Sequence, residues 1–230
     1  MLIVLALLLQ TAAPEAEADR LFRLGTELVA EGDTAGAVAA WEGIAATGRT
    51  SAAVEHNLGT LALARGDAGR ARLHLERAAR LAPFDDAIAR NVGLAREAVG
   101  AEPPSAAGAV WQRVAAVAGP LGLVALALAL VFGAVGLYLL GRPRGALAVA
   151  GVAVVAVGAA SAALWERSRP DGVVLAREAE VFGAPSASAA RVAGVRAGDV
   201  VLVGEAASGW RRVWVDGAAG WLPERAVARL

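Results

Sequence analysis

The sequence predicts a multidomain protein with an all-α helical repeat, a two-helix transmembrane hairpin and an all-β barrel, in that order. Three observations lead to this class. A block of residues near the N-terminus recurs 34 positions later, two long uncharged stretches occupy the middle of the chain, and short β-branched runs separated by turn residues fill the C-terminal part. Of the 230 residues, 57% are hydrophobic. This fraction is high for a soluble protein, so part of the chain is expected to leave water.

Charge and residue content exclude several classes of function. The 22 basic and 22 acidic residues balance, and every basic residue is Arg. No polybasic stripe therefore indicates nucleic-acid binding. The chain has no Cys, which excludes disulfides, thiolate metal sites and Cys nucleophiles. His56 and His74 are the only histidines, and no nucleophile elbow, phosphate loop or metal-ligand spacing occurs. We expect a protein that is not an enzyme and that has no cofactor or metal.

Residues 1–18 have the pattern of a secretory signal peptide. Met1 to Leu9 is apolar, too short to span a bilayer, and is followed by Ala16-Glu17-Ala18, a typical cleavage pattern. No Lys or Arg precedes the apolar run, so a retained N-terminal anchor and a misjudged start codon remain alternatives. A cleaved signal and a retained anchor both predict that the following residues are exported.

Residues 19–99 have a helical pattern with an internal repeat. Leu24-Gly25-Thr26 recurs as Leu58-Gly59-Thr60, and the Gly32-Asp33 step recurs as Gly66-Asp67. A helix of about 14 residues, a Gly-Asp turn and a second helix account for this period. The pattern resembles the tetratricopeptide repeat over residues 18–85, followed by a capping helix at 87–99 that shields the last repeat. We expect Gly59 to face Ala71 across the second helix pair.

In tetratricopeptide repeats, ligands bind the concave face of the first helices. The resemblance predicts a protein-binding face that includes Phe22, Thr26, His56, Asn57, Thr60, Ala87 and Asn91. The carboxylate clamp of this family uses Lys and Asn, and only Asn57 has a counterpart, so we expect a different ligand. We expect His74 on a solvated helix face. Asp85 and Asp86 should complement the dipole of the capping helix.

Residues 100–113 have the composition of a linker, and residues 114–166 predict two transmembrane helices. Val114 to Gly141 and Ala146 to Leu164 are uncharged, and each is long enough to cross the hydrocarbon core. Arg142 and Arg144 in the intervening turn favour the cytoplasm. We therefore expect a multi-pass protein of the bacterial inner membrane with both soluble domains in the periplasm.

Residues 171–230 predict a small barrel of short strands. Val200 to Val203 and Val213 to Val215 are β-branched runs, bounded by the turn pairs Gly198-Asp199 and Ser208-Gly209. With Gly220-Trp221-Leu222 near the end, this order resembles the bacterial SH3 domain. Glu180-Val181-Phe182 stands where that family usually has an Asn-Val-Arg-like stretch, a departure that bears on ligand preference and leaves the fold intact.

Alternation along the strand that contains Trp214 predicts a binding face. If Val213 and Val215 point into the core, Arg212 and Trp214 point outward together. An indole beside a guanidinium is a common composition for a protein contact. The alternative is that Trp214 covers a neighbouring loop or the membrane surface. Trp221, in contrast, is expected in the core.

The order of signal, tetratricopeptide repeats, hairpin and bacterial SH3 domain resembles the E-type proteins of the Bacteroides aerotolerance (Bat) operons over nearly the whole chain. The resemblance implies an accessory protein that works with von Willebrand factor A-domain membrane proteins and a MoxR-type ATPase. We expect a non-catalytic scaffold that presents both soluble domains to protein partners. The alternative is a protein that binds or senses peptidoglycan through the barrel, which a cluster of exposed aromatic residues there would favour.

Overall fold

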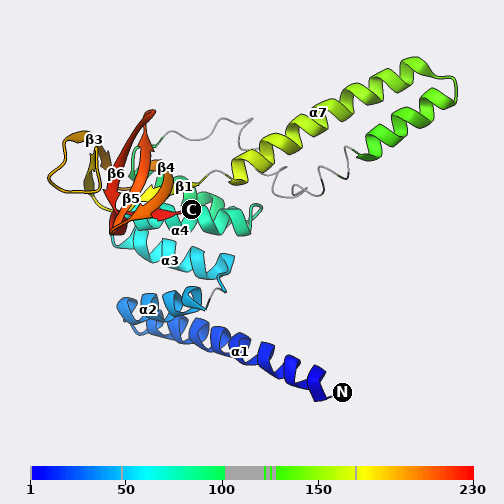
Figure 1. Cartoon of the computed structure of the whole chain (residues 1–230). Coiled ribbons are helices and arrows are strands. Elements are labelled where there is room, and N and C mark those ends of the chain that lie inside the picture. Colours follow the sequence, from blue (N-terminus) through cyan, green and yellow to red (C-terminus); the bar gives the residue numbers. More distant parts are fainter. Residues whose placement is uncertain (1, 48, 102–121, 123–124, 126–127, 169) are drawn as a thin grey trace. The chain divides into compact units, whose positions relative to one another are not determined.

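The computed structural model describes residues 2–47, 49–101, 122, 125, 128–168 and 170–230 (Figure 1). The chain divides into two compact units. The first comprises Met1–Pro103 together with Asp171–Leu230, and the second comprises Pro104–Pro170. The first unit therefore contains both the N-terminal helices and the C-terminal sheet.

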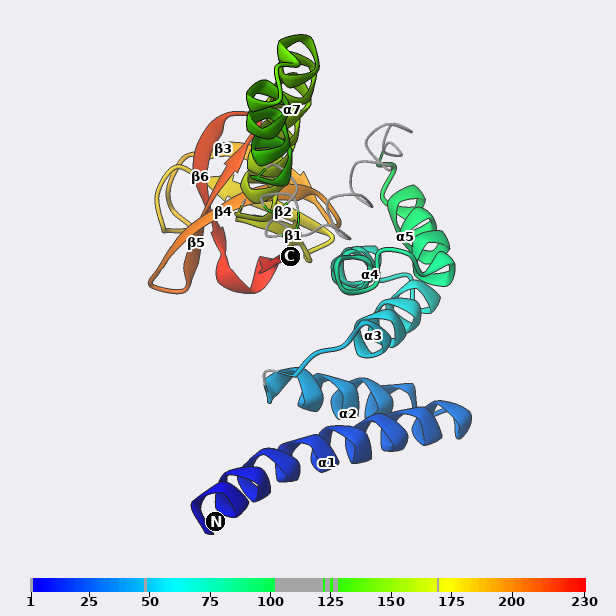
Figure 2. The same ribbon diagram turned by 90° about the vertical axis from the view of Figure 1, so that its right-hand side faces the viewer.

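Five helices form the N-terminal part of the first unit. They are α1 (Leu2–Ala30), α2 (Thr34–Ala46), α3 (Ala52–Ala64), α4 (Ala68–Leu81) and α5 (Asp86–Ala98). Figure 2 shows α1 beside α2, and α3 beside α4, as successive pairs. Helix α1 continues without a break through the segment that resembles a signal peptide, whose cleavage stays a prediction.

The two Gly-Asp steps end one helix and begin the next. Gly32 and Gly66 have φ angles of 85° and 70°, a region that only glycine adopts at little cost. The following residue is the N-cap of the next helix in both cases. Asp33 accepts a hydrogen bond from the Gly36 N–H, and Asp67 accepts one from the Arg70 N–H.

Glycines allow the helices of each pair to approach closely. A Cβ atom on Gly25 would lie 2.3 Å from Nε1 of Trp41, and one on Gly59 would lie 2.5 Å from Cγ of Leu75. The two contacts are related by the same offset of 34 positions that relates the sequence blocks. The expected contact of Gly59 is corrected by one turn, because Leu75 and not Ala71 meets it. Ala71 is fully buried in the cluster around Leu75 and Ile88.

Seven antiparallel strands form the C-terminal part of the first unit. They are β1 (Asp171–Val174), β2 (Glu178–Phe182), β3 (Arg191–Arg196), β4 (Val200–Ala207), β5 (Trp210–Val215), β6 (Ala218–Pro223) and β7 (Val227–Arg229), with a 3₁₀ helix η1 (Glu224–Ala226) before the last. The strand order is β3-β2-β6-β5-β4-β1-β7.

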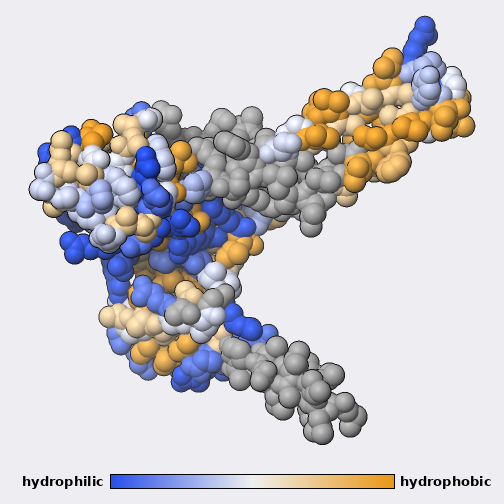
Figure 3. All heavy atoms as spheres, in the orientation of Figure 1, coloured by the Kyte–Doolittle hydropathy of each residue, from blue (hydrophilic) through white to orange (hydrophobic). Residues whose placement is uncertain are grey.

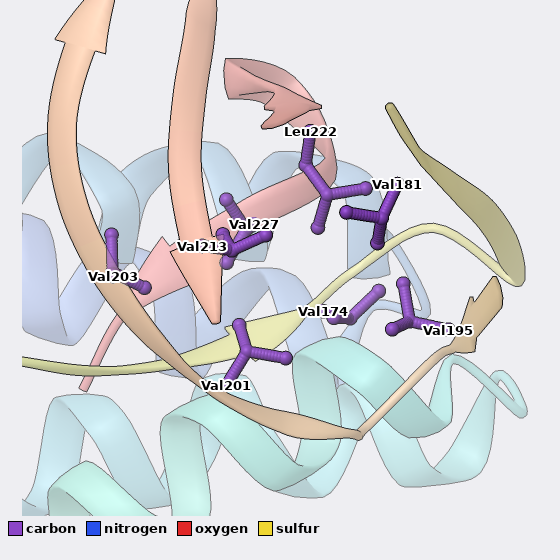
Figure 4. Close-up of a cluster of buried hydrophobic side chains, with 8 residues drawn as sticks. All are labelled: Val174, Val181, Val195, Val201, Val203, Val213, Leu222 and Val227. Carbon is purple, nitrogen blue, oxygen red and sulfur yellow. The ribbon is translucent and has the colours of Figure 1, made fainter. Parts of the chain in front are cut away.

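The sheet encloses a core of small branched side chains. Figure 4 shows that it consists of Val174, Val181, Val195, Val201, Val203, Val213, Leu222 and Val227. Because the members come from all seven strands, the sheet must curl to bring them together. The sequence prediction of a barrel of short strands over this segment is confirmed.

The second unit contains a helix at residues 128–139, a turn and α7 (Pro143–Ser168). Many of its described apolar side chains are exposed, and Figure 3 shows them in orange on both helices. Phe132, Leu139 and Leu147 are 74%, 79% and 74% exposed. Residues 102–113 of the linker and residues 114–121 of the first predicted span lie outside the described residues.

The prediction of a transmembrane hairpin is wrong for the described part of the chain. Within that part, no helix combines the length and the apolar character needed to cross a bilayer. The expected location of the two soluble domains stays a prediction.

Candidate binding sites

Strand β5 presents Arg212 and Trp214 on its outer face, as alternation predicts. Val213 is fully buried, and Val215 packs against the same core. The guanidinium carbon of Arg212 lies 5.3 Å from the centroid of the Trp214 ring. The ring also covers Gly204, where a Cβ atom would lie 2.8 Å from the indole. Trp214 is therefore half-buried, held between strand β4 and its cationic neighbour.

Trp221 also lies on the outer face, which corrects the expectation that it belongs to the core. In strand β6 the inward positions are Gly220 and Leu222, both buried. A Cβ atom on Gly220 would lie 2.3 Å from Val181, so this position must be glycine to close the barrel. Trp221 stands between them in sequence and points the other way, directly opposite Arg212 in the β5–β6 ladder.

An aromatic cluster surrounds Trp221 on this face. Its Cα partner in strand β2 is Phe182. The ring of Phe182 meets that of Trp210 edge to face, with centroids 5.6 Å apart and an interplanar angle of 85°. Trp210 in turn stands opposite Pro223 in the β5–β6 ladder. We name the half-buried set Phe182, Trp210, Trp221 and Pro223 the aromatic face.

An open groove of about 960 Å³ adjoins the aromatic face. Phe182 and Pro223 contribute to its lining, and the charged side chains that line it are Glu178, Glu180, Arg191, Arg196 and Arg225. Arg191 pairs with Glu180. In the described part of the chain, the guanidinium groups of Arg196 and Arg225 have no carboxylate partner. The groove therefore offers two available cations beside apolar rings.

The aromatic face was missed at the sequence level because β2 and β6 are far apart in the chain. Alternation within β6 indicates where Trp221 points. Gly220 and Leu222 are two positions apart and therefore face the core together, so Trp221 between them faces outward. Only the pairing of β2 with β6 shows that Phe182 stands beside Trp221.

On the helices, three of the predicted binding residues come together between α3 and α5. The Asn91 amide nitrogen lies 2.9 Å from Nε2 of His56 and donates to the Thr60 hydroxyl at 3.1 Å. The Thr60 hydroxyl donates in turn to the backbone carbonyl of His56. We name His56, Thr60 and Asn91 the polar cluster. Asn57 and Ala87 are partly buried nearby in sequence. Among the hydrogen bonds of the described residues, none joins the Asn57 side chain to this cluster, and the methyl group of Ala87 cannot form one.

Phe22 and Thr26 lie on α1 and have local contacts. The carbonyl of Phe22 accepts hydrogen bonds from Thr26 Oγ1 at 2.9 Å and from Trp41 Nε1 at 3.3 Å. The Phe22 ring packs against Trp41, with centroids 6.4 Å apart. These contacts join α1 to α2, and they do not bring Phe22 or Thr26 to the polar cluster.

Asp85 caps α5, as expected for an acidic residue at that place. Its carboxylate accepts hydrogen bonds from the N–H groups of Ile88 and Ala87, and these bonds lower the pKa of Asp85 below its ordinary value. His74 is not on a solvated helix face, which corrects that expectation. Its side chain is 13% exposed and lies against the buried carboxylate of Glu55, a residue that no sequence pattern distinguishes.

Among the described residues, no group of three or more His, Asp or Glu side chains is placed to hold a metal ion. No curated protein matches the chain. A family model described as the bacterial SH3 domain matches residues 176–228. The matched range covers strands β2 to β6 and most of β7, so it contains the whole aromatic face. The family match identifies this segment of the chain as a bacterial SH3 domain.

Proposed function

We propose that the protein is a non-catalytic adaptor whose barrel binds an extended segment of a partner protein at the aromatic face. The observation that supports this most is the position of Phe182 and Trp221 as Cα partners, with Trp210 packed edge to face on Phe182. Half-buried aromatic rings contribute a large contact area at a low entropic cost, because they have few rotatable bonds.

The adjoining groove favours a polypeptide as the ligand. Arg196 and Arg225 can each donate several hydrogen bonds to carboxylate or carbonyl oxygens. Glu178 can accept from a ligand amide or cation. Charges of both signs beside apolar rings suit a peptide, which carries donors and acceptors along its whole length.

The helices supply a second contact in this proposal. They resemble tetratricopeptide repeats, and the polar cluster offers an imidazole, a hydroxyl and an amide at one place on α3 and α5. The resemblance to Bat E-type proteins makes a von Willebrand factor A-domain membrane protein the first candidate partner, together with a MoxR-type ATPase. We place the binding in the periplasm on the basis of the N-terminal segment alone.

A second candidate function is binding of cell-wall peptidoglycan through the barrel. The aromatic face is the specific observation in its favour, since sugar rings stack on exposed indoles. The charged groove could then receive the peptide stems. This candidate differs from the first in the ligand and not in the location of the site.

Two assays with the full chain distinguish the candidates. The first measures sedimentation of the protein with purified peptidoglycan, and the second measures capture of a co-expressed von Willebrand A-domain protein from the same genome. Trp221→Ala should weaken whichever interaction is real. Phe84→Ala is the matched control, because Phe84 is an aromatic residue 57% exposed on the helical part. If Trp221→Ala and Phe84→Ala behave alike in both assays, the aromatic face is not the binding site.

A further inference from the structure

The barrel contacts one side of helix α4, and this contact is independent of what the barrel binds. Arg72 donates a hydrogen bond from Nη1 to the carbonyl of Gly198 at 2.7 Å. Arg77, one and a half turns later, donates to the carbonyl of Arg229 in the edge strand β7. Arg80 lies 4.0 Å from the carboxylate of Asp171 in β1. At 3.6 residues per turn these three positions fall within an arc of about 140°, so they lie on one side of the helix.

Two glycines allow the backbones to meet at this contact. A Cβ atom on Gly69 would lie 2.8 Å from the carbonyl oxygen of Val174 and 3.1 Å from Cα of Leu175. Both are backbone atoms of the barrel, which cannot rotate away. On the other side, a Cβ atom on Gly198 would lie 2.4 Å from the side chain of Val99 at the end of α5. Each partner therefore has a glycine where the other approaches.

The charged groups at the contact form a connected network. Arg96 binds Glu76 with two hydrogen bonds of 2.7 and 2.9 Å, and Glu76 lies 3.8 Å from Nε of Arg72. The side chains of Arg72, Glu76 and Arg96 are only 15 to 17% exposed. Burial lowers the pKa of Arg72 from its ordinary value, and the charge of Glu76 opposes this change. The network is partly removed from water, as expected of an interface.

Comparison of α4 with α2, its equivalent in the 34-residue repeat, shows that the residues of this face occur only in α4. At the equivalent positions of α2 stand Ala35, Val38, Gly43 and Ala46 in place of Gly69, Arg72, Arg77 and Arg80. Gly69 is buried, whereas Ala35 is exposed. In contrast, Ala71, which packs within the second helix pair, matches Ala37 in the first pair, and both are fully buried. The residues of α4 that meet the barrel therefore have no counterpart in α2.

We propose that Gly69, Arg72, Arg77 and Arg80 form a built docking surface on α4 whose partner is the SH3-like barrel of the same chain. The barrel and the second helix pair then form one body. The barrel is not an independent module that only the preceding segment connects to the helices. Its aromatic face and the polar cluster are carried by the same rigid unit. The docking also places the Arg77 side chain on β7, an edge strand that would otherwise be open to pairing.

Cleavage of the full chain tests the proposal. Protease sites inserted before Glu102 and before Pro170 separate the helices from the barrel after purification, and a tag after Leu230 captures the barrel. We expect the helical fragment to be retained on the tagged barrel. If the two fragments separate after cleavage of a chain that carries no substitution in the α4 surface, the proposal is overturned.

Three variants of the cleavable chain identify the surface. Gly69→Leu should reduce retention of the helical fragment by at least about tenfold, because its side chain meets barrel backbone. Arg72→Met should also reduce retention, while Arg96 keeps Glu76 paired. Gly93→Ala is the matched control, since a Cβ atom there meets nothing within 4 Å, and it should leave retention unchanged. Far-UV circular dichroism before cleavage should show the same helix content in all variants. Equal retention by Gly69→Leu and Gly93→Ala would show that α4 is not the docking surface.

Discussion

Nδ1 of His74 lies 2.7 Å from Oε2 of Glu55, on the facing helix of the second pair. The Glu55 side chain is 3% exposed, and its other oxygen accepts a hydrogen bond from Thr50 Oγ1 at 2.8 Å. At the equivalent positions of the first pair stand Leu21 and Ala40. The second pair therefore contains a polar contact where the first pair has an apolar one.

We expect His74→Ala to destabilise the protein by about 3 kcal/mol, because it removes a partner from a buried carboxylate. The double variant Glu55→Leu with His74→Ala reproduces the residues of the first pair. It should recover most of the lost stability, since no buried charge then lacks a partner. Urea denaturation followed by circular dichroism measures both values. A double variant no more stable than His74→Ala would contradict this account.

Stability should also depend on pH through Glu55. Burial raises the pKa of Glu55, but hydrogen bonds from His74 and Thr50, together with the charges of His74 and Arg77, outweigh burial, and the pKa lies below its ordinary value. A pKa lower in the folded than in the unfolded state contributes stability above the unfolded value of about 4.3. This contribution is lost as the pH falls through the folded value. The free energy of unfolding should therefore fall less steeply below about pH 5 in Glu55→Gln than in the wild type. Parallel curves would show that Glu55 is not the group responsible.

Gly59→Ala should destabilise the second helix pair by about 1 to 3 kcal/mol, because the new Cβ atom overlaps Leu75. Helix propensity alone predicts the opposite sign, a gain of about 1 kcal/mol for Gly→Ala inside a helix. Gly93→Ala in α5 meets open space and should show that gain. Thermal unfolding of the two variants checks the difference, and a gain at Gly59 would mean that the helices are not in close contact there.

Leu222→Ala and Trp221→Ala should differ in stability although they are neighbours. Leu222 is fully buried in the barrel core, and its truncation should cost about 2 to 5 kcal/mol. Trp221 lies on the outer face and should cost less than Leu222 when truncated, while its loss weakens ligand binding. Thermal unfolding of the barrel measures the loss of stability in each variant. An equal loss at both positions would place the indole in the core.

Export of the barrel can be tested with one new cysteine. The chain has none of its own, so Ser208→Cys, at an exposed position in the β4–β5 turn, gives a single reactive site. If the N-terminal segment directs export, a maleimide that cannot cross the inner membrane should label this site in intact cells. Labelling only after lysis would locate the barrel in the cytoplasm.

The sequence by itself determined the local structure of this protein. The Gly-Asp steps predict where helices end and begin, because glycine permits a positive φ and aspartate caps the next helix. Alternation in β5 predicts that Val213 points inward and Trp214 outward. These features depend on residues close together in the chain, so a linear pattern contains them. A linear pattern also suggested a transmembrane hairpin, and the described helices do not support it.

Only the tertiary structure decided which distant residues meet. It paired β2 with β6, which placed Phe182 beside Trp221, and it placed that indole on the outer face and not in the expected core. It buried Glu55 against His74, and it brought Gly69 of α4 against Val174 of β1 across more than a hundred residues of sequence. Such contacts depend on the packing of whole elements. The effect of one glycine or one charge on stability depends on the group that faces it.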